Sequence, residues 1–297
     1  MLKSEIAPAK VNLTLEITGK RSDGYHNIIS LIQTIDLCDY LTFHKNQWLQ
    51  IIPEYQNLPL NDGLPTFDRN NYLIKNLVYK AAELLKKETG YKGGAIIELK
   101  KNIPSAAGLG GGSSDAAATL KGLNRLWNLK LTDDELAEIG LKVGSDVPFF
   151  IYKGTCLVSG RGEIIKQEKP IFPRWILIIL LPIDIKEKTK KLYSYITEKN
   201  FSSGVYTDKI MKIADSANDE EFNLSLFNVF DDIYCQIFEE YNVWVKEFKE
   251  IGISPVHLAG SGPSVFYVSS DESKILEAAE KVSNITNLKL YITRTVP

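Results

Sequence analysis

Cysteine is scarce in this sequence, with three residues among 297. Cys38, Cys156 and Cys235 lie far apart and form no C-x-x-C pair or Cys/His cluster. An odd number of dispersed cysteines provides neither a disulfide framework nor the ligand spacing of a zinc site. We therefore expect reduced thiols in a cytoplasmic protein, and we expect each cysteine to be a small core residue rather than a nucleophile.

Long hydrophobic runs and a strong net charge are also missing. The longest apolar run, Trp175 to Pro182, is far shorter than the roughly 20 residues of a membrane helix and predicts a buried strand. The net charge of −2 gives no electrostatic reason to expect nucleic acid or an anionic membrane as a partner. The chain starts almost at once with motif-like sequence, so we expect no signal or transit peptide.

The remaining composition is ordinary for a globular protein, with 44% hydrophobic and 24% charged residues. A chain of this length can bury a large core, and we expect two closely joined domains, 1–160 and 161–297. The predicted strands and helices alternate irregularly along the chain, which indicates an α+β fold. Thr132-Asp-Asp-Glu135 is a capping box that predicts the start of a helix, and we expect residues 206–250 to be helical.

A glycine-rich loop separates a predicted strand, Ala95 to Lys101, from a helix that continues to Trp127. Its four glycines are Gly108, Gly110, Gly111 and Gly112. Backbone N–H groups of such a loop can close on an anion, and the N-terminus of the following helix favours negative charge. We expect Ser113, Ser114 and Asp115 to cap that helix.

The type of loop is restricted by what it lacks. The chain has no G-x-x-x-x-G-K-[ST], which excludes a Walker A loop, and Gly108-Leu109-Gly110 lacks the third glycine and the downstream acid of a dinucleotide fingerprint. Glycine content alone favours an anion site over a tight turn packed on a helix, and it leaves both possible.

The whole phrase from Pro104 to Ala117, PSAAGLGGGSSDAA, resembles the phosphate loop of the GHMP kinases, which include galactokinase and the homoserine, mevalonate and phosphomevalonate kinases. The triple glycine followed by Ser-Ser-Asp/Asn-Ala-Ala resembles one family among them, the 4-diphosphocytidyl-2-C-methyl-D-erythritol kinases. The resemblance implies a two-domain fold, with a ribosomal protein S5 domain 2-like N-terminal domain and a ferredoxin-like C-terminal domain. It also implies ATP contacts from Pro104, Ser105, Ala106, Ala107, Gly108, Leu109, Gly110, Gly111, Gly112, Ser113 and Ser114.

The N-terminal stretch supports this resemblance. Residues 6–18 predict a strand with Lys10, Asn12 and Thr14 on one face, and the usual fate of such a polar face is solvation. A turn at Gly19 to Gly24 then predicts a hairpin. The sequences Pro8-Ala-Lys-Val-Asn-Leu and Gly19-Lys-Arg-Ser-Asp-Gly-Tyr-His resemble the N-terminal signature of the family. By that resemblance Lys10 and Asn12 face the reacting hydroxyl, and Tyr25 and His26 hold the cytosine.

Asp146 lies in Gly144-Ser145-Asp146-Val147-Pro148. By spacing alone we would favour a turn or helix-cap carboxylate. The phrase resembles the family's Gly-[AS]-Asp-Val-Pro, whose aspartate is the proposed catalytic base, and this resemblance reverses the preference. Lys10 would then orient the carboxylate and stabilise the transferring phosphoryl group.

Three further segments resemble the family. Asn76 opens an Asn-Leu segment of the kind found near the adenine, with Asn71 as a competing candidate. Thr189 and Tyr193 match a threonine and an aromatic residue that stacks on the cytosine opposite Tyr25, although the basic run Lys186 to Lys191 is unusual for that pattern. The phrase Ala259 to Ser264 resembles a third motif that approaches the nucleotide phosphates, through Gly260 and Ser261.

Together these motifs imply transfer of the ATP γ-phosphoryl group to the 2-hydroxyl of 4-diphosphocytidyl-2-C-methyl-D-erythritol, a step of non-mevalonate isoprenoid synthesis. ATP and Mg²⁺ are the implied cofactors; the metal ligands are unknown, with Ser114 as a possibility. The expected partner is this small molecule, and we expect no nucleic acid and no membrane as partners. We expect the protein to be a monomer or a weak homodimer. Another GHMP small-molecule kinase, of homoserine or mevalonate type, and a non-catalytic nucleotide-binding protein of the same fold remain alternatives.

Overall fold

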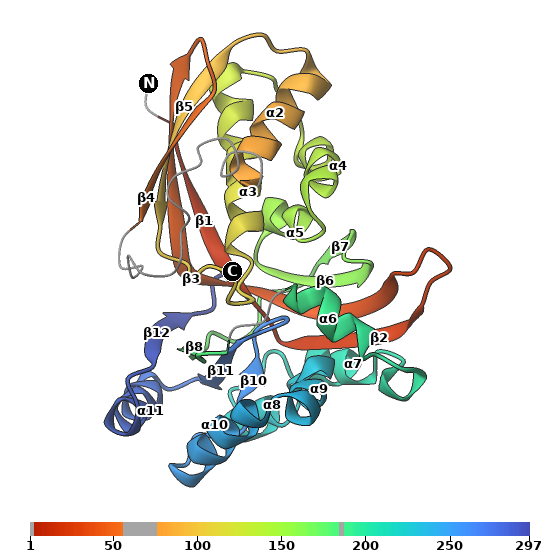
Figure 1. Cartoon of the computed structure of the whole chain (residues 1–297), viewed down its shortest axis with the longest axis vertical. Coiled ribbons are helices and arrows are strands. Elements are labelled where there is room, and N and C mark those ends of the chain that lie inside the picture. The colour runs from red at the N-terminus through yellow and green to blue at the C-terminus, as the bar shows by residue number, and fades with distance from the viewer. Residues whose placement is uncertain (1–2, 56–75, 184–186) are drawn as a thin grey trace. The chain divides into compact units, whose positions relative to one another are not determined.

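The computed structural model describes residues 3–55, 76–183 and 187–297 (Figure 1). The chain divides into two compact units, each of which is described by itself. The first unit comprises residues 1–9, 37–105 and 110–153, and the second comprises residues 10–36, 106–109 and 154–297. The predicted domains 1–160 and 161–297 stay a prediction. The segment Asn57 to Asn71, whose prolines, glycine and asparagines predict an irregular loop, lies outside the described residues.

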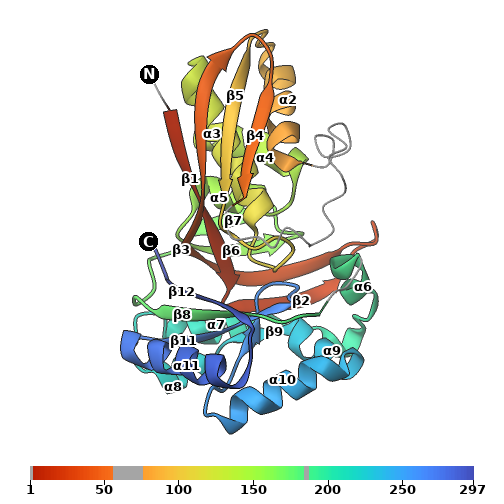
Figure 2. The ribbon, with the colours of Figure 1, turned by 60° about the vertical axis from the view of Figure 1, so that its left-hand side comes forward.

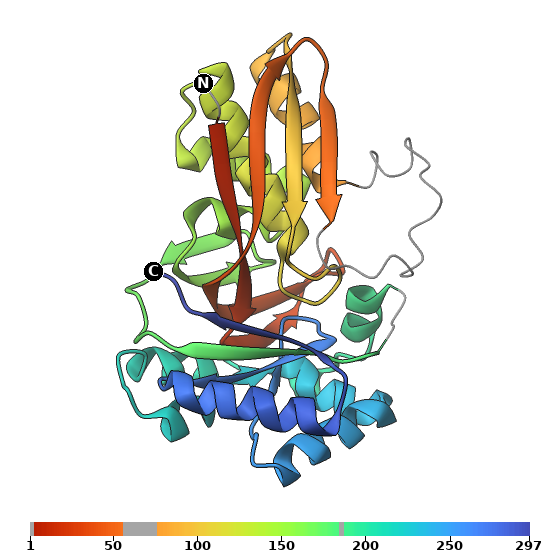
Figure 3. The same ribbon diagram turned by 90° about the vertical axis from the view of Figure 1, so that its left-hand side faces the viewer.

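The first unit is a sheet with helices on one face (Figures 1 and 3). Its strands are β1 (Lys3–Asn12) up to Ala9, the C-terminal half of β3 (His26–Asn46), β4 (Gln50–Tyr55) and β5 (Gly94–Lys101). Its helices are α2 (Leu77–Thr89), α3 (Gly111–Trp127), α4 (Asp133–Val143) and α5 (Val147–Tyr152). Strand β5 pairs antiparallel with β3 and parallel with β4, which places it at the centre of this sheet.

Local sequence determines where these helices begin and end. The side chain of Asn76 accepts a hydrogen bond from Val78 N at 2.9 Å and caps α2, and Gly90 ends the helix with φ 69°. The predicted capping box of α4 is confirmed, because Thr132 Oγ1 accepts from Glu135 N and the Glu135 carboxylate accepts from Thr132 N.

The second unit contains two sheets and a layer of helices (Figure 2). One sheet contains the N-terminal half of β3 with β2 (Thr14–Lys20), β6 (Thr155–Gly160), β7 (Ile164–Gln167) and β9 (Phe227–Asn228); the other has the order β10 (His257–Leu258), β11 (Ser264–Ser269), β8 (Trp175–Leu180), β12 (Lys289–Arg294). The helices are α6 (Lys188–Ser194), α7 (Val205–Lys212), α8 (Asp219–Asn223), α9 (Val229–Ile237), α10 (Glu239–Glu250) and α11 (Glu272–Ile285), with a 3-10 turn at Glu198–Asn200. The predicted hairpin is confirmed, since Lys20 pairs with His26. Both units contain strands and helices, which confirms the predicted α+β class.

The prediction that residues 206–250 are helical throughout is wrong. Short loops and strand β9 divide this stretch, and β9 pairs parallel with β2 through Thr14 and Phe227. The cause is Asn228, whose side chain accepts from Phe230 N to cap α9 and donates to the carbonyls of Leu258 and Gly260. An apolar periodicity cannot report such a cap, because its partners lie some 30 residues further along the chain.

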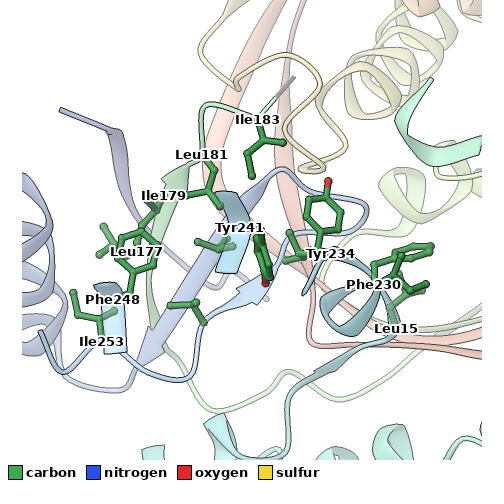
Figure 4. Close-up of a cluster of buried hydrophobic side chains, with 14 of the residues drawn as sticks. Leu15, Leu177, Ile179, Leu181, Ile183, Phe230, Tyr234, Tyr241, Phe248 and Ile253 are labelled. Atoms are coloured by element: carbon green, nitrogen blue, oxygen red, sulfur yellow. The ribbon is translucent and has the colours of Figure 1, made fainter. Parts of the chain in front are cut away.

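The core of the second unit is a cluster of aliphatic and aromatic side chains from β2, β8, α9 and α10 (Figure 4). Tyr234, Tyr241 and Phe248, from the stretch 206–250, are all buried in it. Burial of each such side chain contributes roughly 1.5–3 kcal/mol. The hydroxyl of Tyr234 donates to Ser261 O at 2.8 Å, so the core also fixes a backbone position of the third motif.

The first unit contains a cluster of buried charged side chains. Lys101 Nζ, at the end of β5, contacts Asp39 Oδ2 and lies 2.6 Å from Asp115 Oδ2 in α3. Burial raises the pKa of Asp115 to about 8, because one ammonium is shared between two carboxylates and does not fully offset the burial. Asp39 Oδ1 also accepts from Asn102 N and Ile103 N, so the cluster fixes the backbone that enters the glycine loop.

The variant Asp115→Asn tests this cluster. The raised pKa means that the native state holds this proton more tightly than the unfolded chain, so the stability it contributes is lost as pH rises through about 8. Asparagine does not titrate. The melting temperature of the variant should therefore rise relative to the wild type between about pH 4 and about pH 8, and the difference should change little above that range. Asp133→Asn, at an exposed carboxylate, is the control, and a difference that does not change with pH would contradict the assignment.

Within the described residues no helix combines the length and the apolar character that crossing a bilayer requires. Cys38, Cys156 and Cys235 all carry free thiols, and only Cys156 is fully buried, so the prediction of core positions for Cys38 and Cys235 is wrong. Cys38 is half-buried and Cys235 is exposed on α9.

Candidate active site

The glycine loop enters α3 without a side-chain cap. Gly110 is the N-cap residue with φ 74°, and Ser113, Ser114 and Asp115 lie inside the helix. The prediction that these three residues cap the helix is wrong, because the glycine run itself forms the first helical turn. The first N–H groups of α3 therefore have no intrahelical acceptor and no capping side chain, which is the arrangement that binds anions at helix N-termini.

The preceding part of the loop, 106–109, packs in the second unit against the third motif. A Cβ added at Gly108 would lie 1.8 Å from Ala259 O, so only glycine allows this approach of two backbones. Ser264 Oγ donates to Ala107 O at 2.5 Å. The structure thus brings the predicted loop residues 106–109 beside Gly260, where a Cβ would in turn lie 2.9 Å from Gly108 O.

Lys10 and Asn12 lie at the end of β1 and are each only 5% exposed. Lys10 Nζ donates to Asn12 Oδ1 at 2.5 Å, and Asn12 Nδ2 donates to Ser30 Oγ at 2.8 Å. Lys10 also donates its backbone N–H to Leu109 O at 3.0 Å. The polar face of this strand is therefore buried rather than solvated, and a Cβ at Gly260 would lie 2.9 Å from Lys10 Nζ.

The hydrogen bonds continue from Ser30 within the second unit. Ser30 Oγ donates to Thr14 O at 2.5 Å, and Thr14 Oγ1 lies 2.7 Å from Thr207 Oγ1. Thr207 donates its N–H and its hydroxyl to Glu16, each at 2.7 Å. Sequence analysis missed Ser30, Thr207 and Glu16, because their partners are remote in the chain and no local pattern marks them.

The predicted base-binding residues lie around one end of the hairpin in the second unit. Tyr25 is 59% exposed, and the guanidinium of Arg161 lies 5.1 Å from its ring centroid. The His26 ring stacks on Tyr193 at 5.4 Å between centroids and 27° between planes. Burial, together with the charge of Lys20, lowers the pKa of His26, so its imidazole is neutral at pH 7.

Thr189 lies beside the third motif. Its Oγ1 is 3.2 Å from Ser261 Oγ, so a residue predicted to contact the substrate and one predicted to contact ATP share a hydrogen bond. Both positions contribute exposed or half-buried hydroxyls to the same loop.

Asp146 is exposed at the N-cap position of α5, and its side chain makes no capping hydrogen bond. The helix-cap role that spacing favoured is therefore not the role this carboxylate has. Asp146 belongs to the first unit and Lys10 to the second, so their meeting stays a prediction. Asn76 is in use as the cap of α2, its adenine contact stays a prediction, and Asn71 lies outside the described residues.

Comparison with known proteins defines the class. Residues 76–154 match the model of the GHMP kinases N-terminal domain. The solved structure of a 4-(cytidine 5'-diphospho)-2C-methyl-D-erythritol kinase superposes with a TM-score of 0.79 at 26% identity over 99% of both chains. A homoserine kinase from Cytophaga hutchinsonii gives 0.70 at 16% identity, covering 99% of this chain and 94% of its own, and shows the fold alone. The chain has the fold of the GHMP kinases.

One curated relative identifies the branch. The 4-diphosphocytidyl-2-C-methyl-D-erythritol kinase of Dehalococcoides mccartyi is 37% identical over 279 residues, which cover 93% of this chain and 91% of the relative. The chain therefore belongs to the 4-diphosphocytidyl-2-C-methyl-D-erythritol kinase family.

Ser30→Ala tests the hydrogen-bond chain at Lys10. The change leaves the buried Asn12 Nδ2 without its acceptor, a loss of roughly 1–3 kcal/mol, and frees the amide to turn away from Lys10. We expect turnover to fall about tenfold or more with little change in the Michaelis constant for ATP. Ser30→Thr keeps the hydroxyl and should restore turnover.

The matched control is Thr18→Val. It removes a hydroxyl of β2 that donates to Asn27 O and takes no part in the hydrogen bonds that link Lys10, Asn12 and Ser30. Steady-state kinetics and thermal melts of all three variants separate the effects. Equal losses of stability and turnover in Ser30→Ala, without rescue by threonine, would contradict a positioning role.

Proposed function

We propose that this protein transfers the γ-phosphoryl group of ATP to the 2-hydroxyl of 4-diphosphocytidyl-2-C-methyl-D-erythritol, in the non-mevalonate pathway of isoprenoid synthesis. Family membership supports this reaction. The observation that carries it in the structure is the buried ammonium of Lys10, held by Asn12 beside two glycine loops that present backbone groups. Such a charge, in a site that the backbone can approach closely, suits a phosphoryl group.

The phosphate loop holds ATP mainly with backbone groups. The N-terminal N–H groups of α3, preceded by Gly110, bind phosphate oxygens and the helix dipole favours their charge. Pro104 to Leu109 lead into this turn, and Gly260 and Ser261 approach the phosphates from the third motif. Among the described residues, Asn76 is the proposed contact to the adenine.

Lys10, Asn12 and Asp146 form the proposed catalytic group. Asp146 accepts the proton of the substrate hydroxyl, a role open to a carboxylate whose oxygens are exposed and not used in a cap. Lys10 orients that carboxylate and stabilises the charge on the transferring phosphoryl group. Asn12 holds the Lys10 ammonium and faces the reacting hydroxyl. Alignment and charge stabilisation account for most of such catalysis.

Aromatic residues provide specificity for cytidine. The exposed ring of Tyr25 and the ring of Tyr193 stack on the two faces of the cytosine, and the neutral His26, packed on Tyr193, bonds its edge. Thr189 contacts the same substrate. These residues favour the cytidyl substrate over homoserine or mevalonate, which have no ring to stack.

Magnesium enters with ATP as its counter-ion. Within the described residues no group of three or more His, Cys, Asp or Glu side chains could hold a metal by itself. A kinase metal keeps several waters and takes few protein ligands. Ser114 Oγ fits such a role, because it is buried and has no hydrogen-bond partner among the described residues.

The protein acts on a small molecule, and we propose that it does so as a monomer or weak homodimer, without nucleic acid or membrane. Its three free thiols fit a reducing compartment, which supports a cytoplasmic location. A non-catalytic nucleotide-binding protein of the same fold would not need a proton acceptor such as Asp146.

A coupled ADP-release assay on the purified protein tests the proposal. The cytidyl-methylerythritol substrate, homoserine and mevalonate are compared as acceptors, with ATP hydrolysis in their absence as the background. We expect turnover with the cytidyl substrate alone. Preference for another acceptor would contradict the proposed substrate and identify a different one. ATP binding without turnover on any alcohol would support the non-catalytic alternative.

Asp146→Asn separates the catalytic from the structural role of this residue. The amide keeps the shape and removes the proton acceptor, so turnover should fall by about 10²-fold or more while the dissociation constant for ATP changes little. Turnover and equilibrium ATP binding are measured on the same preparation. An equal loss in both would assign Asp146 a structural role.

A further inference from the structure

Lys188 is a lysine of the basic run that the family pattern does not explain. It is the first residue of α6 and half-buried. Its Nζ donates to Ala106 O at 2.7 Å and also contacts Gly262 O. Ala106 belongs to the phosphate loop and Gly262 to the third motif, and all three residues lie in the second unit. One ammonium thus joins the two loops proposed to surround the nucleotide phosphates.

Both carbonyls come from residues in the left-handed region, Ala106 with φ 56° and Gly262 with φ 70°. For a non-glycine residue such as Ala106 this conformation is strained and needs support from its surroundings. The bond from Lys188 supplies part of that support. Without it, the first turn of the phosphate loop has less to hold it in this conformation.

The charges of Lys188 and Lys10 both lie beside loop residues 106–109. Burial lowers the pKa of the Lys188 ammonium to about 8, and the positive charge of Lys10 on β1 adds to this effect. On its own helix Lys190 is paired with Glu187 and Lys191 lies over the Phe238 ring. Two ammonium groups that repel each other beside the same glycine loops are both stabilised when an anion binds there.

We propose that Lys188 is a second phosphate-binding cation of this site, which takes the polyphosphate of the nucleotide together with Lys10 while positioning the phosphate loop and the third motif. An ammonium has three hydrogens, and two are directed to Ala106 O and Gly262 O. The third is available to a phosphate oxygen. The inference rests on the proposed function, in that the anion is the phosphate chain of ATP.

The proposal predicts a pH dependence. The charged form of Lys188 binds the anion, so the affinity of the free enzyme for ATP should fall as pH rises through about 8. Lys188→Arg keeps a charge that does not titrate in this range, and Lys188→Met removes it. Lys190→Met is the matched control, because its side chain is 85% exposed on the same helix.

The test is calorimetric titration of each full-length protein with Mg·ATP in the absence of acceptor, from about pH 6.5 to about pH 9.5, with thermal melts alongside. We expect Lys188→Met to weaken ATP binding about tenfold or more at pH 7 and to lose the pH dependence. Lys188→Arg should retain most of the affinity and also lose the pH dependence. Lys190→Met should match the wild type.

The outcomes distinguish this inference from the proposed function. Wild-type affinity and pH dependence in Lys188→Met would overturn the inference alone, and so would a lower melting temperature with unchanged ATP affinity, which is the result of a purely structural lysine. A wild-type protein that binds no ATP would overturn the proposed function and the inference with it.

Discussion

The buried ammonium of Lys10 is the constraint on which the candidate site depends. A charge with 5% exposure is stable only when its hydrogens and its charge are matched by partners. Asn12 provides the first partner, and its own amide is then fixed by Ser30, whose oxygen is placed by β2. One charge at the end of β1 therefore sets the register of the neighbouring strands, because a shift by one residue would remove every polar partner at once.

Glycine and lysine are complementary in this arrangement. Gly108 and Gly260 let the two backbones approach closely, and neither the loop from Pro104 to Ser114 nor the third motif from Ala259 to Ser264 contains a charged residue. Positive charge must then come from elements outside the loops, and Lys10 on β1 and Lys188 on α6 supply it. This division differs from a Walker A loop, in which the lysine is part of the loop itself.

Sequence predicted the parts of this structure that depend on neighbours in the chain. The capping box at Thr132 and the hairpin that pairs Lys20 with His26 both follow from residues within a few positions of one another. The resemblance to a family supplied the candidate residues, of which the structure brings together Lys10 with Asn12, and His26 with Tyr193.

What sequence could not predict is non-local. Ser30 and Lys188 act through partners 18 and 82 positions away, and the cap at Asn228 depends on carbonyls of another strand. Alternation on residues 6–18 correctly placed Lys10 and Asn12 on one face, but periodicity reports only that a face is polar. Whether that face meets water or buried partners is decided by the strands packed against it, and here it is buried.

The glycine loop shows why a flexible segment needs anchors supplied by other elements. No charged residue lies from Pro104 to Ser114, so the loop cannot hold itself by ion pairs. Its entry follows Lys101, which is buried between Asp39 and Asp115 in the first unit, and its residues 106–109 are held in the second unit by Lys10, Lys188 and Ser264. Because residues 106–109 are held in this way within the second unit, Gly108 loses conformational freedom before an anion binds, and that part of the entropy of ordering does not have to be supplied by the ligand.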